Sequence, residues 1–155
     1  MIEIPDGNVC ALADFDRAAI VIEPVISERG YIPTPAGFLA GLAERCRRHG
    51  ILLIADEVQS GFGRTGDFFA FQQAGIRPGI ISMAKGMGNG FPIGGVLIGP
   101  DFKASYGLLG TTFGGNHLAS AAAVAVLEVI EAEKLIEGVE ELSRFATARI
   151  KNLPG

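Results

Sequence analysis

Two short apolar runs flank a segment with helical periodicity in the first half of the chain. Residues 19–22 and 51–55 are rich in Ile, Leu and Val and each run ends at an acidic residue, which is typical of strands buried on both faces. Between them, apolar side chains recur at helical spacing over 36–49, and Gly50 follows where a left-handed C-terminal cap is expected. The pattern predicts a strand, a helix and a second strand parallel to the first.

The second half predicts two further strands and two long helices. Short apolar runs at 80–83 and 96–98 are separated by a glycine-rich loop, and a short helix is expected over 67–74. Helices are predicted over 118–133 and 136–151, and small side chains in the first half of the former favour close packing against a neighbour. The fold class predicted is therefore α/β, with a mostly parallel sheet flanked by helices.

Composition and charge narrow the class of protein. The chain is 48% hydrophobic and 19% charged, which favours a sheet buried on both faces or a surface that meets a partner. A net charge of −4, with the basic cluster confined to 45–49 at the end of a predicted helix, argues against nucleic-acid binding. Cys10 and Cys46 lack ligand spacing, so no metal site is expected. No signal peptide or membrane-spanning stretch is found, and we expect a cytoplasmic protein.

Charged side chains follow three of the predicted strands. Glu23, Asp56 and Lys85 follow the carboxyl ends of the predicted strands 19–22, 51–55 and 80–83. The carboxyl ends of parallel strands lie at one edge of a sheet, and ligands bind at that edge. Taken singly, Asp56 is more often a turn residue and Lys85 an exposed side chain. Together they favour a site that pairs a carboxylate with a cation and offers an amine for a Schiff base. The glycines after Lys85 leave room for a flat ring but match neither a P-loop nor a dinucleotide fingerprint.

Three long motifs carry a resemblance to a known family. They are residues 54–66 (IADEVQSGFGRTG), 82–95 (SMAKGMGNGFPIGG) and 110–116 (GTTFGGN). In this order the chain resembles the class III aminotransferases of the ornithine and acetylornithine type, from about Ala18 onward. The resemblance implies the fold type I of pyridoxal-phosphate-dependent transferases, here incomplete, and pyridoxal 5'-phosphate as the cofactor.

The resemblance also implies roles for individual residues. Lys85 would bind the cofactor covalently and later move a proton between the substrate carbon and the cofactor. Asp56 would pair with the pyridinium nitrogen and keep it protonated, which makes the ring a better electron sink. Val58 would pack against the ring face, and Gln59 would hydrogen-bond near the phenolic oxygen. Thr112 would bind the cofactor phosphate of the neighbouring subunit, so a homodimer is expected.

Other positions are less settled by the resemblance. Glu23 matches a family glutamate near the substrate end of the cofactor, and the alternative is a strand-end residue that only supports its loop. Residues 26–30 (ISERG) depart from the usual Gln-Gly-Glu-Gly-Gly, which leaves the substrate assignment open there. His117 is expected to be a residue of the helix N-terminus and not a catalytic base.

Domain organisation follows from the length of the family members, which are much longer than this chain. Residues 1–134 are expected to be part of the large cofactor-binding domain, and residues 135–155 to begin the linker toward a C-terminal small domain.

The expected reaction transfers an amino group from an ω-amino acid such as N-acetylornithine to 2-oxoglutarate. Alanine–glyoxylate and 4-aminobutyrate aminotransferases are close alternatives, whereas Gln59 and residues 63–66 disfavour a glutamate-semialdehyde aminomutase. Two alternatives from other classes are a non-catalytic remnant that binds the cofactor weakly or joins a full-length partner, and an α/β binding module without a cofactor. The binding module would leave the joint placement of Asp56 and Lys85 unexplained.

Overall fold

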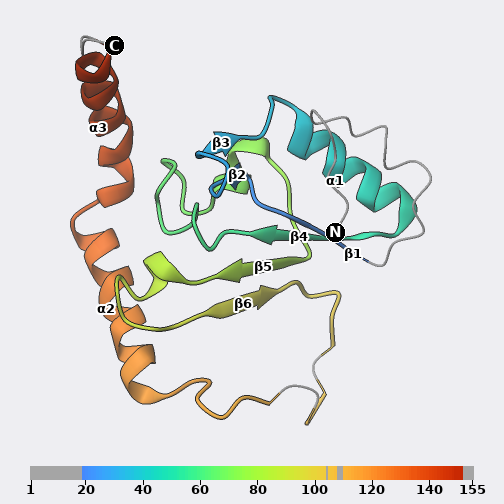
Figure 1. The fold of residues 1–155 in the computed structure, drawn as a ribbon. Helices are drawn as coiled ribbons and strands as arrows, with labels where there is room; N and C mark the ends of the chain where they lie inside the picture. Colours follow the sequence, from blue (N-terminus) through green and yellow to red (C-terminus); the bar gives the residue numbers. More distant parts are fainter. Residues whose placement is uncertain (1–18, 104, 108–109, 152–155) are drawn as a thin grey trace.

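A four-stranded sheet forms the centre of the computed structural model, which describes residues 19–103, 105–107 and 110–151 (Figure 1). Its strands run in the order β1 (Ala19–Ile22), β4 (Leu52–Asp56), β5 (Ile80–Met83) and β6 (Gly95–Ile98). The first three are parallel, and β6 pairs antiparallel with β5. The mostly parallel sheet is therefore confirmed, with an antiparallel strand at one edge. Cys10 lies outside the described residues.

Helix α1 (Phe38–His49) connects β1 to β4 and supplies most of the core. Leu42 and Cys46 are almost fully buried and pack with Leu53 of β4, and burial raises the pKa of the Cys46 thiol. The helix begins two residues later than the sequence predicts because Gly37 has a φ of 76°, which is not helical. The left-handed cap expected at Gly50 is confirmed, with a φ of 64°.

A small hairpin follows β1, where the sequence predicts only a loop. It pairs β2 (Val25–Ile26) with β3 (Ile32–Pro33) in antiparallel register. Strands of two residues are too short to show any alternation in the sequence, which is why this element could not be predicted. The tip turns through a hydrogen bond from Gly30 N to Ser27 O (3.0 Å).

The segment expected to hold a short helix forms a 3-10 helix, η3 (Ala70–Ala74). It begins after Phe69 because that residue is extended, with φ −123° and ψ 138°. Aromatic rings pack closely here, with centroids 5.2 Å apart for Phe62–Phe68, 4.8 Å for Phe68–Phe69 and 5.6 Å for Phe69–Phe71. This aromatic cluster fixes the loop between β4 and β5.

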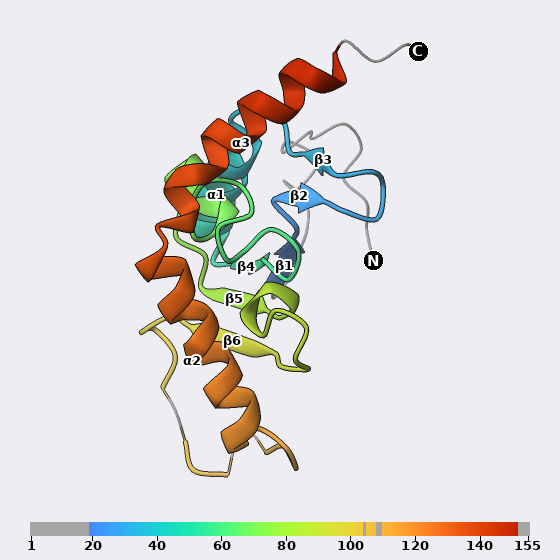
Figure 2. The same cartoon turned by 90° about the vertical axis from the view of Figure 1, so that its left-hand side faces the viewer.

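Helices α2 (His117–Ala132) and α3 (Leu135–Ile150) follow one another along one side of the sheet (Figure 1). In the view turned by 90°, both helices stand in front of the edge of the sheet at which β4 and β5 end (Figure 2). Ala119 and Ala123 are buried, and α2 contacts the 3-10 turn η4 (Lys85–Met87), so the small residues do permit close packing. Within the described residues, no helix is both long and apolar enough to cross a membrane.

Candidate functional site

Glu23, Asp56 and Lys85 do meet at one edge of the sheet. Strands β1, β4 and β5 are parallel, so the residues that end or follow them lie at the same carboxyl edge. Asp56 is in register with Ser82 of β5, and Lys85 comes three residues after Ser82. The strand pairing confirms the sequence-based prediction that Glu23, Asp56 and Lys85 lie at the same edge of the sheet.

A cavity of about 520 Å³ opens beside Lys85, within the range of small-molecule sites. Its lining residues come from the hairpin, the loop after β4 and the loop after β5: Tyr31, Gln59, Arg64, Lys85, Gly86, Asn89 and Gly90. The side chain of Lys85 is exposed, and its φ of 42° lies in the left-handed region. Such backbone conformations cost about 1–3 kcal/mol outside glycine and gather at functional sites.

Asp56 is half-buried at the end of β4 and does not line this cavity. The backbone N–H of Val58 donates to its Oδ1 (3.1 Å), which fixes the carboxylate in an Asx-type turn. Its second oxygen makes no hydrogen bond to any other residue in the described parts of the chain, so it is available to a cationic group. Gln59, one residue after Val58, reaches the cavity.

Glu57, next to Asp56, is a buried supporting residue that the sequence did not single out. Its side chain has no exposed surface, and its carboxylate accepts hydrogen bonds from Ser60 Oγ (2.6 Å), Ala70 N (3.1 Å) and Phe71 N (2.9 Å). It thereby ties the segment that carries Asp56 to the start of η3. The sequence carries no signal for this, because residues 51–55 are apolar throughout, and the alternation of burial along β4 that places Glu57 on the buried face is seen only in the structure.

Glu23 supports the hairpin. Its Oε2 accepts hydrogen bonds from Ser27 Oγ (2.9 Å) and Ser27 N (3.2 Å), and Ser27 is itself buried. Ser27 stands where the family usually has glycine, so this hydroxyl contact belongs to the departing sequence of residues 26–30. A role for Glu23 toward substrate stays a prediction.

Thr112 lies in the exposed loop before α2 and does not line the Lys85 cavity. Asn116 caps α2, with its Oδ1 accepting from Ala119 N (2.9 Å) and its Nδ2 donating to Phe113 O (2.9 Å). His117 is the first residue of α2, as expected. The position of Thr112 outside its own chain's cavity leaves its proposed action in a neighbouring subunit as a prediction.

The comparison with known families decides the identity of this arrangement. The family model described as aminotransferase class III matches residues 7–154. The chain belongs to the class III aminotransferases.

Relatives and solved structures of this family share both sequence and fold with the chain. Acetylornithine aminotransferase of Mycobacterium leprae is 45% identical, and the match covers 97% of this chain and 38% of that protein. Acetylornithine aminotransferase of Corynebacterium efficiens is 53% identical, and the match covers 76% of this chain and 30% of that protein. The crystal structure of acetylornithine aminotransferase from Elizabethkingia anophelis superposes with a TM-score of 0.83 at 34% identity, covering 97% of this chain and 40% of that one. Ornithine aminotransferase from Plasmodium yoelii gives the same score at the same identity, covering 90% and 39%.

The chain therefore spans 30% to 38% of the length of these two curated relatives. The fold type I of pyridoxal-phosphate-dependent transferases, in partial form, is confirmed by these superpositions.

Class III aminotransferases use pyridoxal 5'-phosphate, and the residues at this edge of the sheet fit that group. An amine, a carboxylate with an available oxygen and an amide side chain are the groups that an aldehyde, a pyridinium nitrogen and a ring hydroxyl require. At the cavity wall, a Cβ added to Gly90 would meet no atom within 4 Å, so a flat ring has space there. No cluster of three metal-binding side chains occurs among the residues the structure describes.

Proposed function

We propose that this chain forms the cofactor-binding core of a class III aminotransferase that moves an amino group from an ω-amino acid to 2-oxoglutarate. The observation that carries the proposal is that Lys85 and Gln59 line one cavity, at the edge of the sheet where β4 ends in Asp56. The relatives named acetylornithine aminotransferase support an N-acetylornithine-like donor.

Each residue has a distinct task in this proposal. Bound pyridoxal phosphate supplies an electron sink for the electron pair released when the carbon beside the amino group loses its proton. Lys85 would hold the cofactor through its amine and then, once displaced, would move that proton between the substrate carbon and the cofactor. Asp56 would bind the ring N–H through its available oxygen, and Gln59 would donate a hydrogen bond to the ring oxygen. Val58 would contact the ring face.

The remaining residues would act around the cofactor. Thr112 would bind the phosphate in the neighbouring site of a homodimer, which suits its exposed position outside its own cavity. Glu23 would hold the hairpin near the donor through Ser27. This enzyme would act in the cytoplasm.

The domain boundary proposed after residue 134 is supported by the backbone. Lys134 has a φ of 51°, which interrupts the helical path between α2 and α3. No residue of α3 is buried among the described residues, in contrast to α2. Residues 1–134 would then belong to the large cofactor domain, and residues 135–155 would begin the linker to a small domain.

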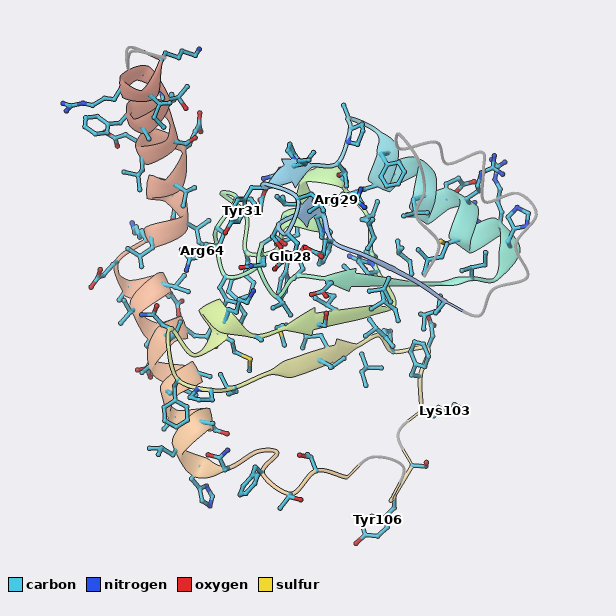
Figure 3. All side chains as sticks on the ribbon, in the orientation of Figure 1. Glu28, Arg29, Tyr31, Arg64, Lys103 and Tyr106 are labelled. Atoms are coloured by element: carbon cyan, nitrogen blue, oxygen red, sulfur yellow. The ribbon has the colours of Figure 1, made fainter. Side chains whose placement is uncertain are left out.

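Absorbance spectroscopy with added pyridoxal phosphate tests this function directly. The chain is expected to develop a cofactor band near the visible edge, because the Lys85 amine is exposed in the cavity and can react with the aldehyde. Lys85→Ala should abolish the band. Lys103→Ala is the matched control, since Lys103 is also exposed but lies far from the labelled Arg64 and Tyr31 (Figure 3).

A band that survives in Lys85→Ala, or is lost equally in Lys103→Ala, would contradict the assignment of Lys85. Turnover of N-acetylornithine in preference to alanine or 4-aminobutyrate would select the acetylornithine type. The alternative is a chain that binds the cofactor without turnover. It predicts the band but no transamination with any of these donors.

A further inference from the structure

The carboxylate of Glu57 is anchored on the face of β4 opposite to that of Asp56. Successive side chains of a strand point to opposite faces, and Glu57 continues the buried face of β4. Both of its oxygens are engaged, because Oε2 accepts from Ser60 Oγ and Ala70 N and Oε1 accepts from Phe71 N. Three donors around a side chain with no exposed surface require an acceptor, and the carboxylate supplies it.

The backbone of Glu57 joins the two strands that carry the candidate site. Its N–H donates to Ser82 O (3.0 Å) on β5, the strand that leads to Lys85, and its C=O accepts from Gly61 N (2.9 Å). No larger residue fits at Gly61 without a shift, because a Cβ there would lie 2.8 Å from Glu57 O. The positions of Asp56 and Lys85 relative to one another are therefore set through Glu57.

The carboxylate of Asp56 depends on the backbone that Glu57 holds. Its Oδ1 accepts from Val58 N (3.1 Å), and Asp56 and Val58 are the two chain neighbours of Glu57. A movement of Glu57 would therefore move the acceptor and the donor of this contact, and with them the second carboxylate oxygen. A group that binds a cofactor needs to be held within about 0.5 Å of its working position.

We propose that Glu57 is a positioning residue for the cofactor, which holds the second oxygen of Asp56 where it can bind the ring N–H. The inference rests on the proposed function, because it takes Asp56 as the partner of the ring nitrogen. A hydrogen bond weakens steeply as its angle departs from linearity, so a small rotation at the end of β4 is enough to weaken cofactor binding. Glu57 touches neither cofactor nor substrate and acts through Asp56.

Amide hydrogen exchange in the cofactor-free chain tests the positioning step. Glu57→Gln keeps the size of the side chain but leaves one acceptor oxygen in place of two, so the turn that holds Asp56 should open more often. Exchange of the Val58 N–H, followed by NMR, is expected to speed up by about tenfold, because buried donors lose their acceptor. Leu42→Val is the matched control, since it removes volume from the core at α1 and should leave the exchange of Val58 unchanged.

A double-mutant cycle on cofactor affinity separates positioning from a general loss of stability. The dissociation constant of pyridoxal phosphate is measured by titration of the cofactor band. Glu57→Gln is expected to raise this constant by about tenfold in the parent chain. In an Asp56→Asn background it should raise the constant by no more than about twofold, because the residue through which Glu57 acts is already changed. Leu42→Val should have little effect in either background.

Three results would overturn the proposal. The first is unchanged exchange of Val58 in Glu57→Gln. The second is an equal loss of cofactor affinity in the parent and Asp56→Asn backgrounds, which is what a purely structural role predicts. The third is a loss of affinity in Leu42→Val as large as that in Glu57→Gln.

Failure of this proposal is distinguishable from failure of the proposed function. A cofactor band that depends on Lys85, combined with unchanged affinity in Glu57→Gln, would leave the function standing and remove the positioning role. A parent chain that forms no Lys85-dependent band would overturn the proposed function, and the positioning role with it.

Discussion

Glu57 shows how a single residue can organise the site without lining the cavity. Its carboxylate has no exposed surface and satisfies two backbone N–H groups at the start of η3 as well as the Ser60 hydroxyl. A buried carboxylate is costly unless it is fully hydrogen-bonded, and these contacts meet that requirement. Because Glu57 follows Asp56 directly, the same contacts hold the end of β4 in place.

Removal of this carboxylate should destabilise the fold. Glu57→Ala is expected to lower the free energy of unfolding by roughly 3 kcal/mol, because two buried N–H groups lose their acceptor. Glu57→Gln should recover only part of the loss, since its NH₂ group cannot accept hydrogen bonds. Urea denaturation measures the effect, with the exposed Glu131→Ala expected within about 0.5 kcal/mol of the parent. Equal losses in Glu57→Ala and Glu131→Ala would contradict this account.

At the same scale, the sequence predicted Asp56 and Lys85 but not Arg64 or Glu57 as residues of the site. Strand ends are visible in a sequence as the points where an apolar run stops. The neighbours of a side chain across a cavity are not visible, because Tyr31 and Arg64 come together only through the hairpin and the turn after β4.

At the scale of elements, α2 depends on a cap at the point where it leaves the Thr112 loop. Asn116 accepts from Ala119 N and donates to Phe113 O, so it orders both the first turn and the loop before it. This coupling means that the helix terminus and the loop bearing Thr112 are stabilised together.

Substitution of the cap should loosen both parts. Asn116→Ala is expected to cost about 1 kcal/mol in the free energy of unfolding, because an N–H at the start of α2 loses its acceptor. Asn116→Asp retains an acceptor and should cost less. Amide hydrogen exchange at Ala119 and Ser120 would report the local opening, and unchanged exchange in Asn116→Ala would contradict the capping role.

Element boundaries followed the sequence where local chemistry sets them. Strand β5 occupies the predicted residues 80–83, and the α1 terminus at Gly50 is where the glycine predicts it. The start of α1 shifted because Gly37 adopts a left-handed conformation, and the hairpin β2–β3 was missed because two-residue strands have no periodicity.

At the scale of the whole molecule, much apolar surface is exposed. Val96, Leu97 and Ile98 of the edge strand β6 are 55%, 48% and 49% exposed. Helices α2 and α3 expose further large apolar side chains, which are Leu118, Val124, Leu127, Val129, Leu135, Leu142, Phe145 and Ile150. Surfaces of this kind mark interaction sites or association, and an unpaired apolar edge strand is a template for pairing.

The chain is therefore expected to self-associate as its concentration rises. Leu97→Lys should shift the association to higher concentration by about tenfold, because a charge on an edge strand opposes pairing. Sedimentation velocity measures the shift. Ala40→Lys adds the same charge at an exposed position of α1 and should leave the association unchanged. A strictly monomeric parent chain at all concentrations would contradict this prediction.

The sequence by itself determined the α/β class, most of the strands and helices, and the three motifs from which the family follows. These depend on local periodicity, turn residues and ordered motifs, which are properties of the chain alone. Only the tertiary structure decided that β6 runs antiparallel, that Glu57 is buried, and that Tyr31 and Arg64 share a cavity with Lys85. Strand pairing and packing between distant segments set these features, and contacts of that kind leave no periodic trace in the sequence.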